Sequence, residues 1–256
     1  MAVIVLQSHR SRQEQTWIGR CIRSVERWAA IRGHDYEFVG DELFDLCGPD
    51  YLAQVRHADV RAITNLARLE LIRRKLAEGY DRAIWIDADV FIFAPHQLKL
   101  EIAMRYAFAR ETWIWARDDG ALIPVAGVNN CVCGFARGEP DLDLLIHLTR
   151  HVAAHRQIRD NYQVGGDILK GLRVVLDFAM FDNIGMFSPK VLGAIADSQA
   201  DILRLQAQSF GSEFYAANLC ITHDGNLLPR AEALMDRLES SGGAVINQYL
   251  RTSGSA

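Results

Sequence analysis

Two aspartates, Asp87 and Asp89, stand directly after a run of apolar residues at 83–86 that reads as a buried strand. In an extended chain, side chains two residues apart point to the same side, which would bring the two carboxylates together. Like charges that close repel each other unless a cation lies between them. Mg²⁺ and Mn²⁺ take oxygen ligands and also bind phosphate oxygens. The pair therefore predicts a divalent metal site that holds a diphosphate; the alternative is a strand-end turn whose acids meet arginines or water.

A second pair with the same spacing, Asp141 and Asp143, provides a comparison within the chain. It follows Pro140 and opens a helical pattern, where carboxylates satisfy the free N–H groups and the dipole of a helix start. We interpret this copy as structural. Only the first pair follows a strand, and ligands of open α/β sheets bind beyond the carboxyl ends of strands.

The elements that must position Asp87 and Asp89 follow an α/β pattern. A short run rich in β-branched residues at 2–7 predicts a strand, and apolar residues at spacings of three and four predict a helix that ends at Gly33. A strand at 36–39 completes a β-α-β unit, which is typical of a parallel sheet. Further elements are expected in chain order: an irregular stretch at 45–57, a helix at 58–78, strands at 112–116 and 131–135, a helix at 141–158, a loop entering a helix at 161–171, a strand at 173–178, a short strand at 219–222 and a helix at 230–239.

Composition limits the class of protein. The chain has 256 residues, of which 50% are hydrophobic, so it can bury a sizeable core, and its formal net charge is −4. This charge argues against a nucleic-acid-binding protein, which usually carries a basic surface. We find no leader pattern and no run near the roughly 20 apolar residues that cross a bilayer. We expect a cytoplasmic protein whose contact with a membrane, if any, is peripheral.

Five cysteines occur at irregular spacing, which argues against a disulfide framework and against a four-cysteine zinc site. Cys131 and Cys133 are expected to be buried thiols on one face of a strand. Reduced thiols fit a cytoplasmic protein. Beyond residue 180 the pattern weakens, and the tail at 251–256 is expected to be disordered.

Taken together, these segments resemble glycosyltransferases of the GT-A fold, particularly the GT8 and galactosyl/mannosyltransferase groups. The matched places span about residues 2–226 in the family's order. They are the first strand Val3–Gln7, the helix with Arg68–Ile72, the segment Tyr80–Asp89, the segment Val128–Phe135, the segment Gly165–Leu169 and the late segment Ile221–Gly225. The resemblance implies one domain with a mostly parallel, Rossmann-like central sheet flanked by helices. Its nucleotide-binding half would cover about 1–110 and its acceptor-binding half about 111–240.

The resemblance also assigns roles to residues. It implies that Asp87, Asp89 and His223 bind Mn²⁺ or Mg²⁺ together with diphosphate oxygens, and imidazole suits Mn²⁺ better than Ca²⁺. Asp167 would act near the reacting carbon of the sugar, with a helix N-cap as its alternative role. A solvated helix arginine is the alternative for Arg68. The remaining donor-binding positions are Gln7, Ser8, Arg68, Ala88, Asn130 and Gly225.

The implied activity is transfer of a sugar from a nucleotide-diphosphate sugar to an acceptor hydroxyl, with retention of the anomeric configuration. A UDP-sugar is favoured over a GDP-sugar as the donor. The acceptor would be a saccharide, a lipid-linked molecule or a small molecule. The chain departs from GT8 after Gly225, where Asn226–Arg230 replaces a lysine-proline-tryptophan run. Two alternatives stay open. One is a haloacid-dehalogenase-type phosphatase, although its expected second acidic motif fails at Gly171. The other is a nucleotide-sugar-binding protein without turnover.

Overall fold

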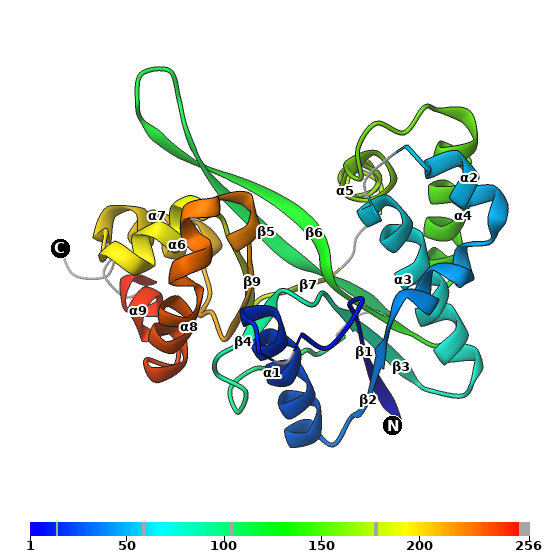
Figure 1. The fold of residues 1–256 in the computed structure, drawn as a ribbon, viewed down its shortest axis with the longest axis horizontal. Coiled ribbons are helices and arrows are strands. Elements are labelled where there is room, and N and C mark those ends of the chain that lie inside the picture. The colour runs from blue at the N-terminus through cyan, green and yellow to red at the C-terminus, as the bar shows by residue number, and fades with distance from the viewer. Residues whose placement is uncertain (14, 58–59, 103–104, 177–178, 251–256) are drawn as a thin grey trace.

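A six-stranded sheet forms the centre of the computed structural model, which describes residues 1–13, 15–57, 60–102, 105–176 and 179–250 (Figure 1). Its strand order is β2-β1-β3-β6-β5-β7. The pairs β1–β2, β1–β3 and β5–β7 are parallel, whereas β3–β6 and β5–β6 are antiparallel. The predicted α/β fold with a mostly parallel sheet is confirmed. The strands are β1 (Val3–Ser8), β2 (Asp35–Val39), β3 (Arg82–Ile86), β5 (Tyr106–Ala116), β6 (Leu122–Ala136) and β7 (Ala179–Phe181).

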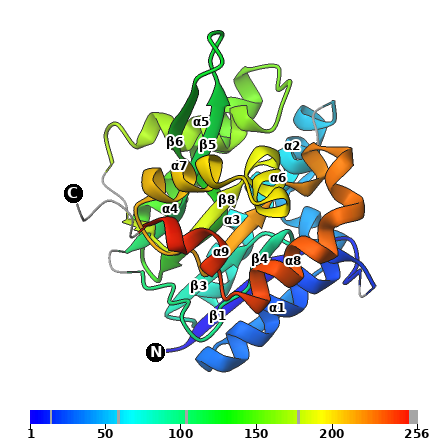
Figure 2. The ribbon, with the colours of Figure 1, turned by 90° about the vertical axis from the view of Figure 1, so that its left-hand side faces the viewer.

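A second, three-stranded sheet has the order β4-β9-β8 and lies toward the C-terminal helices. The long β5–β6 hairpin belongs to the central sheet, and its strand β5 packs against β8 of the small sheet. The tip of the hairpin projects from the body of the molecule at the top of Figure 2. The strands of the small sheet are β4 (Val90–Ile92), β8 (Ile184–Phe187) and β9 (Ala216–Leu219).

The first helix, α1 (Trp17–Arg32), shows how local sequence sets the element ends. Thr16 accepts a hydrogen bond from the Gly19 N–H at its start, and Gly33 ends it in the left-handed conformation at φ 68°, as predicted. No helix in the described ranges is both long and apolar enough to span a bilayer. The other helices are α2 (Pro49–Val55), α3 (Val60–Ala77), α4 (Pro140–His155), α5 (Gly166–Leu172), α6 (Pro189–Asp197), α7 (Ala200–Phe210), α8 (Ala231–Ser240) and α9 (Ala244–Asn247).

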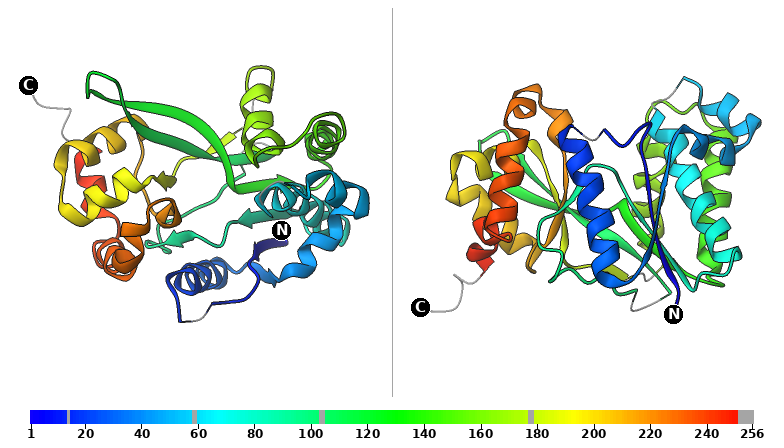
Figure 3. Two further views of the ribbon diagram at one scale, coloured as in Figure 1. Left: turned by 45° about the horizontal axis from the view of Figure 1, so that its top comes forward. Right: turned by 60° about the horizontal axis from the view of Figure 1, so that its bottom comes forward.

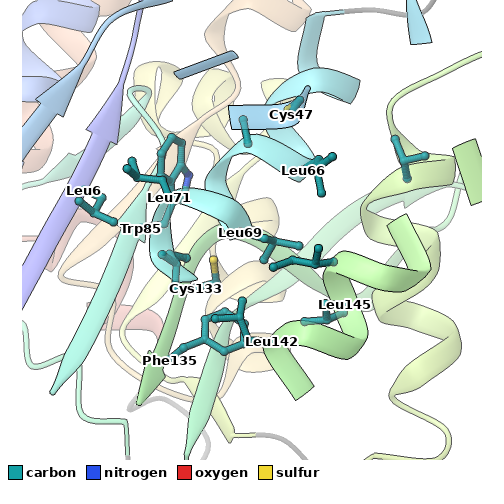
Figure 4. Close-up of a cluster of buried hydrophobic side chains, with 14 of the residues drawn as sticks. Leu6, Cys47, Leu66, Leu69, Leu71, Trp85, Cys133, Phe135, Leu142 and Leu145 are labelled. Atoms are coloured by element: carbon teal, nitrogen blue, oxygen red, sulfur yellow. The ribbon is translucent and has the colours of Figure 1, made fainter. Parts of the chain in front are cut away.

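The helices α3 and α4 cover one face of the central sheet with an apolar core (Figure 4). Alternate strand residues point into it, because successive side chains of a strand face opposite sides. The core gathers Leu6 of β1, Trp85 of β3 and Phe135 of β6 against leucines of the two helices, including Leu69 and Leu145. This packing fixes the carboxyl end of β3, where the predicted acidic pair begins.

The opposite face of the sheet packs against α1. Val5 of β1 and Ile84 of β3 meet Val25 and Trp28 of the helix. In the right-hand view of Figure 3, β1 lies between α1 and α3, and α8 runs beside α1. Arg20 joins these two helices through ion pairs with carboxylates of α8, which are Glu232, Asp236 and Glu239. The C-terminal helices are thereby tied to the N-terminal β-α-β unit.

Several sequence predictions need correction. The stretch at 45–57 is mostly helical, since it contains the end of a 3₁₀ helix (Asp41–Cys47) and α2. Pro49 can start α2 because the first helical position does not need the N–H that proline lacks. Residues 173–175 form a turn instead of a strand, and 177–178 lie outside the described residues. The expected strand at 219–222 ends at Leu219. The predicted disordered tail at 251–256 also lies outside the described residues.

Candidate active site

The acidic pair lies in a turn between β3 and β4. Asp87 follows the last residue of β3, and the N–H of Val90 donates to its carbonyl oxygen at 3.1 Å, which closes the turn. The expected extended chain is therefore wrong in detail, although both carboxylates still line one cleft with Ala88. Asp87 is held from the other side by its N–H, which donates to the carbonyl of Cys131 at 2.7 Å.

Asp87, which is partly buried, makes an ion pair with the buried side chain of Arg68. Its Oδ1 lies 3.2 Å from Nη1 of Arg68 and accepts a hydrogen bond from Nε1 of Trp85 at 2.6 Å. Arg68 is 4% exposed, so it is not a solvated helix arginine. Its guanidinium also lies 5.3 Å from the centre of the Trp85 ring and donates to the carbonyl oxygens of Thr64 and Asn130. The cation is thus fixed beside the acidic turn by four neighbours.

Asp89 is held by the small sheet. Its Oδ1 accepts a hydrogen bond from Nδ2 of Asn218 at 2.6 Å, and its carbonyl accepts the Leu219 N–H at 2.9 Å. Both contacts follow from the β4–β9 pairing, which sets Val90 opposite Asn218. Burial and the neighbouring charge of Asp87 raise the pKa of Asp89 to about 7. Burial likewise raises the pKa of Asp87, and Arg68 opposes this shift.

His223 reaches the same cleft through the β4–β9 pairing. It ends the 3₁₀ helix Ile221–His223, which begins two residues after β9. Its exposed ring lies 6.3 Å from that of Trp113. A residue 134 positions after Asp89 in the sequence thereby lines one cavity with it.

The cleft has a volume of about 320 Å³ and lies over the carboxyl ends of β1 and β3. Seven of the residues predicted for the site line it. They are Ser8, Arg68, Asp87, Ala88, Asp89, Asn130 and His223.

Three other predicted residues are not among those that line the cleft. Gln7 is fully buried and braces the acidic turn, because its Nε2 donates to the Asp87 carbonyl at 3.3 Å and its Oε1 accepts from the Tyr36 hydroxyl. Gly225 is exposed after His223. The Asp167 side chain is 57% exposed and lies 3.9 Å from Nζ of Lys170, whereas Gly166 and Lys170 themselves line the cleft. The predicted role of Asp167 stays a prediction.

Sequence reasoning missed a carboxylate on the opposite wall. Glu111 of β5 is half-buried in the cleft and accepts hydrogen bonds from Nε1 of Trp113 and Nδ2 of Asn129. Gly127 stands opposite Glu111 in the hairpin, and a Cβ there would lie 2.9 Å from a carboxylate oxygen of Glu111. The glycine therefore leaves the space that Glu111 occupies. An isolated glutamate in a strand carries no local signal of this position.

A bulge in β6 presents Asn130 to the cleft. The β5–β6 register jumps from Phe108 opposite Cys133 to Ala109 opposite Asn129, so 130–132 have no partner on β5. The bulge also places the two thiols in different cores, which corrects the expectation that Cys131 and Cys133 share one face. All five cysteines are free and buried.

Asn65 of α3 joins three segments of the cleft wall. It is 5% exposed, its Nδ2 donates to the Asn161 carbonyl at 2.8 Å, and its Oδ1 accepts from Nδ2 of Asn130 at 3.0 Å. A Cβ on Gly165 would lie 2.4 Å from Nδ2 of Asn65. Only glycine fits there while Asn65 keeps both hydrogen bonds.

Gly165→Ala should therefore lower the free energy of unfolding by about 2 kcal/mol, since Asn65 must move and leave buried groups unpaired. For a chain of this length that corresponds to a fall in Tm of roughly 4–8 °C. Thermal unfolding followed by circular dichroism measures it. Gly171→Ala is the control, because nothing lies within 4 Å of its added Cβ. Equal stability of the two variants would contradict the steric account.

The cleft has the donor atoms that a divalent metal requires, but not a preassembled ligand set. Among the described residues, no three His, Cys, Asp or Glu side chains are gathered closely enough to hold a metal ion. The contacts of Asp87 and Asp89 to other side chains use Oδ1 of each carboxylate. Two partly buried carboxylates with raised pKa and a nearby imidazole nevertheless fit Mn²⁺ or Mg²⁺ chemically, because a cation would relieve their repulsion.

The raised pKa of Asp89 predicts a pH-dependent stability in EDTA. The folded protein binds the proton more tightly than the unfolded chain, so the penalty of this carboxylate grows as pH rises from about 4 to 7. The whole pKa shift of Asp89 corresponds to roughly 4 kcal/mol, and we take half of this because the side chain is only partly buried. We therefore expect Asp89→Asn to increase the free energy of unfolding by ~2 kcal/mol at pH 8. At pH 5 the increase should be about a third of that value. Thermal melts at both pH values measure the gain.

Asp143→Asn is the matched control for that series, because the Asp143 side chain is 72% exposed. It should show no gain that depends on pH. A loss of stability in Asp89→Asn at pH 8 would contradict the repulsion that we infer within the pair.

Comparison with known proteins places this cleft in a known fold. No protein-family model and no curated protein matches the sequence. Among solved structures, a glycosyltransferase involved in the glycosylation of the major capsid of PBCV-1 is similar over 91% of this chain and 100% of that chain, with a TM-score of 0.52 and 11% identity. The chain has a GT-A glycosyltransferase fold.

The apo form of mouse xyloside xylosyltransferase 1 is also similar, over 85% of this chain and 96% of that chain, with a TM-score of 0.41 and 10% identity. The fold assignment depends on the first structure alone. Neither comparison assigns the chain to the GT8 or the galactosyl/mannosyltransferase group.

Proposed function

We propose that the protein is a metal-dependent glycosyltransferase that moves a sugar from a nucleotide-diphosphate sugar to an acceptor hydroxyl. The observation that carries this proposal is the position of Asp87 and Asp89, which line a cleft at the carboxyl end of β3 beside the buried cation of Arg68. The fold of the chain supports the same class of reaction. The phosphatase alternative fits less well, because the acidic pair follows the third strand of the chain, whereas phosphatases of that type carry the pair after the first strand of the core.

The residues divide the work as follows. Asp87, Asp89 and His223 would hold Mn²⁺ or Mg²⁺, which when bound neutralises charge on the diphosphate. Arg68 brings a fixed positive charge to the acidic turn, and Lys170 adds another at the cleft wall. Ser8, Ala88 and Asn130 line the donor side of the same cavity. Their positions fit a donor that lies across the carboxyl ends of β1 and β3.

The reacting centre has two candidate carboxylates. Glu111 lines the cleft, and its hydrogen bonds to Trp113 and Asn129 fix it there. Asp167 lies at the start of α5, outside the lining. We propose a UDP-sugar donor and retention of configuration, with Glu111 in contact with the sugar or the acceptor hydroxyl. Five free, buried thiols suit a reducing compartment such as the cytoplasm.

Release of nucleotide diphosphate tests turnover. Purified protein is incubated with UDP-glucose, UDP-galactose, UDP-xylose or GDP-mannose, with Mn²⁺ or with EDTA, and free UDP or GDP is measured over time. The proposal predicts slow release from at least one donor that requires the metal and is lost in Asp87→Asn. The non-catalytic alternative would be favoured if the protein binds the nucleotide only with the metal but releases no UDP or GDP from any donor, even when mixtures of acceptors are added.

A further inference from the structure

One face of the β5–β6 hairpin carries an open apolar strip that continues from the cleft. The register sets Trp113 opposite Val125 and Trp115 opposite Ile123, so these four side chains share one face with Glu111. Trp115, Val125 and Ile123 are 56%, 44% and 37% exposed, respectively. We refer to Trp113, Trp115, Ile123 and Val125 as the hairpin strip.

The other face of the hairpin is already used by the fold. Ile114 and Leu122 point to that side and belong to the core formed with the C-terminal helices. Arg110 fastens the base of β5 by donating to the Phe210 carbonyl at the end of α7 and by pairing with Asp182. The hairpin is therefore supported from behind, and the exposure of the strip does not result from a loose segment.

The strip begins inside the candidate active site. Trp113 lines the cleft, contacts His223 and donates to Glu111, and its ring centre lies 6.1 Å from that of Trp115 at an interplanar angle of 32°. A ligand that enters the cleft over Trp113 would meet Trp115 next. The strip is thus continuous with the place where an acceptor hydroxyl must react.

The chemistry of the strip favours a carbohydrate over a lipid. The C–H face of a pyranose packs on an indole ring, while its hydroxyls bond to carboxylates and amides, and Glu111 stands at the inner end of the strip. The hairpin tip at 117–121 carries Asp118 and Asp119 beside Arg117. This local charge disfavours an anionic membrane surface or a lipid diphosphate, since both require clustered cations.

We infer that the hairpin strip binds the acceptor and that the acceptor is a glycan of at least two residues. The residue that bears the reactive hydroxyl would stack near Trp113, and the following residue would stack on Trp115. This inference rests on the proposed function for the identity of the cleft. It adds the class of acceptor and the surface that selects it.

Saturation-transfer NMR with cellotriose, maltotriose, laminaritriose, xylotriose and mannotriose, each compared with its monosaccharide, tests the inference without donor or metal. We expect at least one trisaccharide to bind about tenfold more tightly than its monosaccharide. Trp115→Ala should lose that preference, and Trp115→Phe should retain most of it. Leu144→Ala is the control, because it removes an exposed apolar side chain, 37% exposed, from α4 and outside the cleft lining.

The inference would be overturned if no trisaccharide binds, or if Trp115→Ala binds the trisaccharide as tightly as the wild type does. It would also be overturned if the hairpin strip instead binds phosphatidylcholine–phosphatidylglycerol vesicles, or if it forms a dimer that Trp115→Ala dissociates. Failure of the proposed function appears separately. In that case the wild type would not bind a nucleotide diphosphate with Mn²⁺, whatever its affinity for glycans.

Discussion

Replacing Asp89 by asparagine should weaken the binding of UDP in the presence of Mn²⁺ by about 100-fold, because loss of a ligand should cost at least the upper end of the losses seen when a hydrogen-bond partner of a ligand is replaced. Asparagine has nearly the same shape and retains an oxygen that can accept the hydrogen bond from Asn218. It lacks the negative charge that a divalent cation requires. The loss should therefore occur in a protein that remains folded and, at pH 8, is more stable than the wild type. Equilibrium dialysis with labelled UDP measures the change.

The chain supplies its own control for that experiment. Asp141 and Asp143 repeat the spacing of the acidic pair but lie in the first turn of α4, as the sequence predicts. The double variant Asp141→Asn/Asp143→Asn should bind UDP as the wild type does. Equal loss in both variants, or no loss in Asp89→Asn, would show that the acidic turn does not hold the donor.

Replacing Arg68 by methionine should lower the free energy of unfolding by about 3–4 kcal/mol, because it leaves the Asp87 carboxylate partly buried without its cation. Methionine keeps most of the apolar stem but none of the donors to Asp87, Thr64 and Asn130. The expected fall in Tm is roughly 6–16 °C. Chemical denaturation in urea with EDTA present measures the free energy directly.

A double-mutant cycle separates the ion pair from the other contacts of Arg68. Asp87→Asn removes the unpaired charge, so Arg68→Met/Asp87→Asn should recover about 1–2 kcal/mol relative to Arg68→Met alone. Additive effects of the two substitutions would contradict an energetic coupling between the guanidinium and the carboxylate. Arg74→Met is the control substitution, since the Arg74 side chain is 61% exposed on the same helix.

The N-terminal half of the fold could be predicted because its elements follow simple periods. The β1-α1-β2 unit and β3 are short apolar runs separated by a helix with one apolar stripe, and Gly33 marks the helix end. The acidic pair after β3 was recognised for the same reason, since its position relative to the strand is local information.

The opposite wall of the cleft could not be predicted from local patterns. Glu111 and Trp113 enter the site only through the register of the β5–β6 hairpin, and Asn218 only through the β4–β9 pairing. The burial of Arg68 depends on Trp85 and on the bulge at Asn130, both from other elements. Each of these placements is a long-range pairing, which spacing along the chain does not encode.

Calorimetric titration of the wild-type protein with UDP and with GDP, each with and without Mn²⁺, tests the central claim most directly. The proposed donor site predicts binding of UDP that requires the metal, with weaker or no binding of GDP. Absence of binding by both nucleotides under every metal condition would contradict the assignment of the cleft as a nucleotide-sugar site.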